Sequence, residues 1–160
     1  MVDLDPRLIC ANVGRDIWVG HRDACDKDEY PADCRILHIW REDHPGNTCD
    51  KAKDGSGRPT GDLSLEYKDG ESLENMDKSI EELEEFFKIP GKVYVHCAVG
   101  QTRSPTIALI GLAVRGENVY DAVGHILADI HMSRGIVWNI CLTPLREILQ
   151  RYGTPYSKET

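Results

Sequence analysis

Four segments of the chain have the pattern of apolar and polar positions that is typical of β-strands. They are residues 17–21, 34–40, 62–67 and 92–96. The segment 62–67 alternates between apolar and polar residues, which predicts a half-buried strand. The segment Lys92-Val93-Tyr94-Val95-His96 is instead an almost unbroken run of β-branched and aromatic residues, as expected for a strand inside a sheet.

Helical patterns separate and follow these strands. They cover residues 74–88, 104–113, 118–131 and 143–152. Pro105 suits the first turn of the second helix, and Thr143 with Pro144 predicts an N-cap and first turn for the last one. The alternation of strands and helices predicts an α/β fold, with a central, mostly parallel sheet flanked by helices on both sides. At 160 residues, we expect one domain over residues 1–160.

The stretch His96-Cys97-Ala98-Val99-Gly100-Gln101-Thr102-Arg103-Ser104 joins the strand 92–96 to the helix at 104. A strand, a tight loop and a helix N-terminus form an anion site, because loop N–H groups converge and the helix end adds positive partial charge. Such a site favours the thiolate form of Cys97, which is the nucleophilic form. Arg103 can hold two phosphoryl oxygens through its planar guanidinium. The stretch therefore predicts nucleophilic attack on a phosphoryl group.

The other residues of this stretch have supporting roles in the same prediction. Backbone amides of the loop would bind the phosphoryl oxygens without a metal ion; the loop residues are Ala98, Val99, Gly100, Gln101 and Thr102. His96 would orient the loop, and Ser104 would hydrogen-bond the sulfur of Cys97 and help it leave. The loop adds no further Lys or Arg, which disfavours the most highly charged substrates. The alternative is a core strand with a structural cysteine and an unrelated arginine, but the strand–loop–helix context favours the motif.

This stretch resembles the His-Cys-x5-Arg-Ser/Thr signature of the cysteine-dependent protein phosphatases. The chain length and the Arg-Ser-Pro-Thr continuation are most similar to small dual-specificity phosphatases. The resemblance implies a protein tyrosine phosphatase-like fold, a cysteinyl-phosphate intermediate, no cofactor, and phosphotyrosine and phosphoserine/threonine proteins as substrates. Outside the motif the match is one of pattern only. Residues 131–139 depart from the family's Pro-Asn-x-x-Phe stretch, and the glycine-rich residues 46–61 read as a surface loop.

A phosphatase also needs an acid that protonates the leaving group. In the resembling family this acid follows a strand and precedes a helix like the one predicted at 74–88. Asp69 occupies that place, although an Asp before a Gly is also a common turn. Asp62 is a second candidate, and Asp43 lies too far upstream.

Composition narrows the functions further. The net charge of −8 argues against a nucleic-acid binder or a binder of acidic membranes. No apolar stretch suggests a membrane span, and no N-terminal segment resembles a signal peptide. The six cysteines form no Cys-x-x-Cys, and a reactive thiolate must stay reduced, so we expect a reducing, cytoplasmic location.

Two other functions stay open at the level of sequence. One is a catalytically inactive module that binds phosphorylated ligands. The other is a phosphatase of a non-protein substrate, such as an RNA 5′-triphosphate or a phosphoinositide. Retention of Cys97, Arg103 and a candidate acid favours the enzyme over the binding module.

Overall fold

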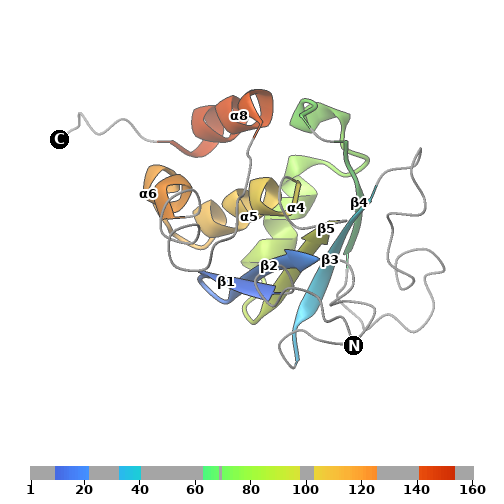
Figure 1. The fold of residues 1–160 in the computed structure, drawn as a ribbon, viewed down its shortest axis with the longest axis vertical. Coiled ribbons are helices and arrows are strands. Elements are labelled where there is room, and N and C mark those ends of the chain that lie inside the picture. Colours follow the sequence, from blue (N-terminus) through green and yellow to red (C-terminus); the bar gives the residue numbers. More distant parts are fainter. Residues whose placement is uncertain are drawn as a thin grey trace, which may run out of the picture.

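One five-stranded sheet organises the chain in the computed structural model (Figure 1), which describes residues 10–21, 33–40, 63–68, 70–97, 103–125 and 141–153. The strands are β1 (Cys10–Gly14), β2 (Ile17–His21), β3 (Arg35–Trp40), β4 (Leu63–Glu66) and β5 (Val93–Cys97). Their order is β1-β2-β5-β3-β4, so β5 lies in the centre. Only β1 and β2 pair antiparallel; the other three pairs are parallel, as the sequence predicted.

The strand β1 was not predicted from the sequence. It forms a hairpin with β2, in which Gly14 pairs with Ile17 across a two-residue turn. The turn residues Arg15 and Asp16 have φ angles of 53° and 60°. Positive φ angles at both turn residues match the twist of a tight hairpin. However, Arg-Asp is not one of the dipeptides, such as Asn-Gly or Gly-Gly, that usually indicate such a turn in a sequence. The hairpin therefore left little signal in the sequence.

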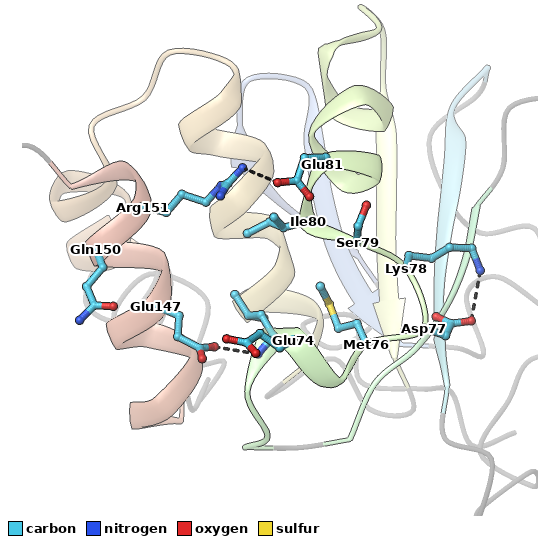
Figure 2. A pocket seen from close by; sticks show the side chains of 11 residues that line it. Glu74, Met76, Asp77, Lys78, Ser79, Ile80, Glu81, Glu147, Gln150 and Arg151 are labelled. Carbon is cyan, nitrogen blue, oxygen red and sulfur yellow. Dashed lines mark hydrogen bonds and ion pairs between the residues drawn. The ribbon is translucent and has the colours of Figure 1, made fainter.

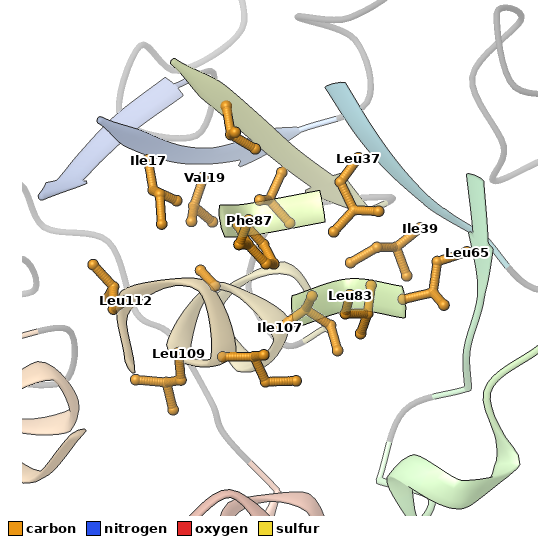
Figure 3. Packing of buried hydrophobic residues seen from close by; sticks show 14 of the residues in the cluster. Ile17, Val19, Leu37, Ile39, Leu65, Leu83, Phe87, Ile107, Leu109 and Leu112 are labelled. Carbon is orange, nitrogen blue, oxygen red and sulfur yellow. The ribbon is translucent and has the colours of Figure 1, made fainter. Parts of the chain in front are cut away.

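The described helices all lie on one face of the sheet (Figure 1). They are η2 (Leu73–Asn75), α4 (Ile80–Lys88), α5 (Arg103–Val114), α6 (Val119–Gly124) and α8 (Leu142–Tyr152). The helix α5 is buried along its length from Arg103 to Leu112 and packs on the inner side chains of the strands (Figure 3). Within the described ranges, no helix is long and apolar enough to cross a membrane.

Side chains on the opposite face of the sheet are buried as well. Ile36, His38, Tyr94 and His96 point away from the helices because strand residues alternate between faces, and each is at most 1% exposed. That face is therefore covered too, although no helix among the described residues lies on it.

The helix predicted over residues 74–88 is in fact two elements. The short helix η2 ends at Asn75, and α4 begins only after Ser79. The side chain of Ser79 accepts a hydrogen bond from Glu82 N, and the Glu82 carboxylate accepts one from Ser79 N, which is a capping box. Between the two helices, Asp77 hydrogen-bonds both the backbone N–H and the backbone C=O of Glu66. These bonds hold the intervening residues in an extended path.

The last helix begins earlier than predicted, whereas the start of the helix before it agrees with the prediction. The N-cap of α8 is Cys141, and Thr143 is already inside the helix. The N-cap of α6 is Asn118, as the predicted start required, and its side chain accepts hydrogen bonds from the N–H groups of Tyr120 and Asp121. The described part of this helix ends at Gly124, and residues 126–131 lie outside the described ranges.

Candidate active site

The candidate site lies where the central strand β5 ends and the buried helix α5 begins. Cys97 is the last residue of β5, and Arg103 is the first residue of α5. The loop between them, residues 98–102, lies outside the described residues, so the predicted roles of Ala98, Val99, Gly100, Gln101 and Thr102 stay predictions. The predicted strand–loop–helix order is confirmed at both described ends. Pro105 sits in the first turn of α5, where its missing N–H costs no intrahelical hydrogen bond.

The side chains of Cys97 and Ser104 are in contact at this junction. The Cys97 Sγ lies 3.4 Å from the Ser104 Oγ, and the two residues are 2% and 0% exposed. A hydroxyl at this distance can donate a hydrogen bond to a sulfur atom, which stabilises negative charge on it. The structure therefore brings together the predicted nucleophile and the predicted helper of its departure.

The guanidinium of Arg103 is held at the same junction. Arg103 is 5% exposed, and its Nη1 donates a hydrogen bond to the backbone carbonyl of Tyr67, 3.3 Å away. Tyr67 directly follows β4, so this bond connects the start of α5 to the chain that leaves the sheet at β4. A guanidinium at a helix N-terminus is suited to an anion, because both carry positive charge.

The residue before the nucleophile makes contacts on the other face of the sheet. The His96 Nδ1 lies 3.4 Å from the backbone oxygen of Cys97, and the His96 Nε2 lies 2.9 Å from the Nδ1 of His38 on β3. The predicted role of His96 in orienting the loop stays a prediction, because the loop lies outside the described residues. His38 was not singled out from the sequence, where it is one polar residue within an apolar strand segment.

The candidate acid, Asp69, lies outside the described residues, as do Asp62 and Asp43. Its neighbours in sequence are described. The N–H of Glu71 donates to the carbonyl of Lys68, and the Tyr67 hydroxyl donates to the carbonyl of Glu71. The Tyr67 carbonyl, two residues before position 69, also accepts a hydrogen bond from Arg103.

Comparisons with solved structures identify the fold. The chain aligns with a human tyrosine phosphatase-like serine/threonine/tyrosine-interacting protein at a TM-score of 0.61 and 18% identity, over 89% of this chain and 94% of that one. A mouse putative dual-specificity phosphatase aligns at 0.57 and 16% identity, over 95% and 90%. The chain has the fold of the tyrosine and dual-specificity phosphatases. PTPMT1, in a complex with PI(5)P, aligns at 0.57 and 20% identity, over 90% and 94%.

The phosphatase fold is thus recognised from structure rather than from overall sequence. A scan against models of known protein families finds no match. A search of curated proteins finds none either. The comparisons confirm the predicted tyrosine phosphatase-like fold. They do not assign roles to individual residues.

The described residues also form a hollow away from the junction of β5 and α5. A groove of about 660 Å³ runs between the N-terminal half of α4 and the helix α8 (Figure 2). We call it the acidic groove; it is lined by Leu73, Glu74, residues 76–81, Glu147, Gln150 and Arg151. Neither Cys97 nor Arg103 lines it. Its carboxylates outnumber its cationic side chains, which is the opposite of what a phosphate ester needs.

Most of the polar side chains of the acidic groove bind the protein itself. The Glu147 carboxylate accepts hydrogen bonds from Leu73 N at 2.7 Å and from the hydroxyl of Ser72. The guanidinium of Arg151 lies 3.3 Å from the carboxylate of Glu81 and 2.9 Å from that of Glu84. This hydrogen-bonded arginine holds the pKa of the Glu84 carboxyl below its usual value. These hydrogen bonds and ion pairs attach α8 to α4 and η2.

Proposed function

We propose that this protein is a metal-independent phosphomonoester hydrolase that works through a cysteinyl-phosphate intermediate. The observation that carries the proposal is the buried Cys97–Ser104 contact beside Arg103, at the C-terminal end of the central parallel strand. In open α/β sheets, ligands bind outside the carboxyl ends of the strands, which is where Cys97 stands. The phosphatase fold of the chain supports the same reading.

In the first step, the thiolate of Cys97 attacks phosphorus, an S–P bond forms, and the bond from phosphorus to the leaving oxygen breaks. Arg103 and the amides of residues 98–102 bind the equatorial oxygens and compensate their charge. Asp69 gives its proton to the leaving oxygen. The hydrogen bond from Arg103 to the Tyr67 carbonyl, two residues before Asp69, supports a place for this acid near Arg103.

In the second step, the Asp69 carboxylate takes a proton from water, which attacks the cysteinyl phosphate. The S–P bond breaks, inorganic phosphate leaves, and the electron pair returns to the sulfur of Cys97. The hydroxyl of Ser104, 3.4 Å from that sulfur, donates a hydrogen bond to the departing thiolate. Asp69 ends the cycle protonated, ready for the next leaving group.

We propose phosphotyrosine and phosphoserine/threonine proteins as the substrates. The dual-specificity phosphatases among the structural neighbours support this class. A reactive thiolate fits a reducing cytoplasmic setting, in which disulfides do not persist. Two alternatives remain: a phosphoinositide, the class of ligand bound to PTPMT1, and a binding-only function like that suggested by the words "phosphatase-like" and "interacting" for the human neighbour.

The decisive experiment is hydrolysis of para-nitrophenyl phosphate between about pH 5 and 8, in EDTA and a reducing agent. We expect turnover in the wild-type chain and none in Cys97→Ser. The matched control is Cys34→Ser, which removes another buried thiol, just before β3 and away from the junction. It should retain turnover. Loss of activity in EDTA, or equal activity in Cys97→Ser, would contradict the proposal.

The alternatives give different outcomes in the same set of assays. A folded wild-type chain that binds phosphotyrosine peptides without any turnover would favour the binding module. Release of phosphate from phosphoinositides, without release from phosphopeptides, would favour the lipid substrate. Release from both phosphotyrosine and phosphoserine peptides supports the protein substrate.

A further inference from the structure

Two histidine side chains form a hydrogen bond behind the candidate nucleophile. The His38 Nδ1 and the His96 Nε2 are 2.9 Å apart, and the rings meet edge to face with centroids 5.0 Å apart. His38 is 0% exposed and His96 is 1% exposed. They are brought together by the β3–β5 pairing, in which residue 38 lies opposite residue 96.

The contacts of His96 determine where its proton lies. Its Nδ1 faces the backbone oxygen of Cys97 at 3.4 Å, and a carbonyl oxygen can only accept a hydrogen bond. The Nδ1 of His96 must therefore carry a proton, because the lone pair of an unprotonated Nδ1 would repel the lone pairs of the carbonyl oxygen. An imidazolium in this position would be a buried charge, which costs free energy, so the neutral ring is the stable form. A neutral ring has one proton, and the His96 Nε2 is left as an acceptor.

The same reasoning fixes the proton of His38. The Nε2 of His96 accepts, so the Nδ1 of His38 must donate. The result is a directed pair of hydrogen bonds, from His38 to His96 and from His96 to the Cys97 carbonyl. This carbonyl belongs to the peptide that opens the loop 98–102. The two hydrogen bonds therefore end at the backbone of Cys97, the last residue of β5.

We propose that His38 is a positioning residue for the nucleophile. It keeps His96 in the tautomer that donates to the Cys97 carbonyl, and so holds the backbone of Cys97 in place. Cys97 is then fixed from two sides, through its carbonyl by His96 and through its sulfur by Ser104. The kinetic consequence rests on the proposed hydrolase function, but the proton positions do not.

The first test is the tautomer of His96 in the free protein, measured by long-range ¹H–¹⁵N NMR of the imidazole rings. Isolated histidine prefers the proton on Nε2, so the expected Nδ1–H form at both His38 and His96 is a distinctive signature. Spectra of His38→Asn and His96→Asn assign the signals. A proton on His96 Nε2, whether in the other tautomer or in an imidazolium, would overturn the proposal.

The second test compares two variants of His38. An asparagine can place its amide nitrogen where the Nδ1 of His38 lies and donate to His96, whereas a leucine of similar size cannot. We expect His38→Leu to lower kcat about 10-fold with little change in KM, in line with the loss of one buried hydrogen bond, and His38→Asn to stay within about 3-fold of wild type. Equal losses in the two variants would show a role in packing only and contradict the proposal.

The two tests separate the possible failures. If the wild-type chain shows no turnover, the proposed hydrolase function fails, while the tautomer still decides whether His38 orients His96. If His38→Leu does not fold, two measurements still test the proposal: the kcat of His38→Asn relative to wild type, and the NMR signature of the tautomer. A kcat of His38→Asn that is about 10-fold lower than wild type, with an unchanged KM, would contradict the proposal.

Discussion

The junction of β5 and α5 and the acidic groove use polar side chains in opposite ways. At the junction, Cys97, Arg103 and Ser104 are nearly inaccessible, with at most 5% of each exposed, and the Cys97 sulfur contacts the Ser104 hydroxyl. In the groove, Glu147 and Arg151 stand in an open hollow and fasten one helix to another. The groove therefore has a structural role, and the β5–α5 junction is the region for which we propose the chemistry.

The largest expected effect comes from making the same substitution in both regions. Arg103→Lys replaces a planar guanidinium that can bind two phosphoryl oxygens with a point charge, and we expect kcat/KM for para-nitrophenyl phosphate to fall on the order of 10³-fold. Arg151→Lys is the matched control, at an arginine whose side chain is 37% exposed. It should leave kcat/KM within about 2-fold and lower stability slightly. Similar losses of activity in the two variants would contradict the proposal that the junction, and not the groove, binds the phosphate ester.

The contrast between the regions also shows what the sequence could predict. The candidate site lies within nine consecutive residues, and its chemistry is carried by residue types at fixed spacing. The strands β2 to β5 were predictable because β-branched residues and alternation mark them locally, whereas β1 was not predicted. The partner of His96 was not predictable, because His38 is 58 positions away and meets it only through the β3–β5 pairing. The Tyr67 carbonyl that binds Arg103 has no sequence signal, because every residue has a carbonyl.

One missed feature had a signal that the sequence analysis overlooked. Ser79-Ile80-Glu81-Glu82 has the Ser-x-x-Glu spacing of a capping box, which marks the true start of α4. The apolar periodicity of residues 74–88 concealed it, because Leu73, Met76 and Ile80 continue a helical pattern across the break. Periodicity reports which side chains face the core, and an extended link between two helices can keep them facing it.

Packing beneath the site offers the next largest effect. Gly111 of α5 lies so close to its neighbours that an added Cβ would be 2.5 Å from Phe87 Cδ1 and 2.8 Å from Ile17 Cδ1. We expect Gly111→Ala to lower the free energy of unfolding by about 1–3 kcal/mol, because overpacking outweighs the better helix propensity of alanine. Urea denaturation measures the change.

The control for this variant is Gly124→Ala in α6, where an added Cβ would meet nothing within 4 Å. Here only helix propensity and chain entropy act, and we expect a gain of up to about 1 kcal/mol. A change of the same sign at both glycines would contradict the close approach of α5 to Phe87. An unchanged stability in Gly111→Ala would show that Phe87 and Ile17 can move aside to make room for the added methyl group.

The smallest effect concerns the hydrogen bonds that fasten α8 to α4 behind the groove. Glu84 accepts from Arg151 Nε at 2.9 Å and from the Tyr152 hydroxyl at 2.6 Å. These bonds hold the pKa of Glu84 below its usual value, with the arginine as the largest cause and burial opposing it. A carboxyl whose pKa is lowered by folding contributes stability above its unfolded pKa of about 4.3 and loses that contribution as the pH falls through its folded value.

Glu84→Gln removes this contribution at every pH. We therefore expect the variant to be about 1 kcal/mol or less below wild type at pH 7, and the difference to shrink as the pH falls below about 4. Urea midpoints across this range measure it. Glu85→Gln is the control, because the Glu85 side chain is 75% exposed and forms an ion pair with Lys88 at the surface, so the substitution should cost less at pH 7. If the Glu84 difference grew toward low pH, the ion pair would destabilise the fold. In that case the ion pair between Glu84 and Arg151 would not stabilise the attachment of α8 to α4, and the structural role assigned to this region would be wrong.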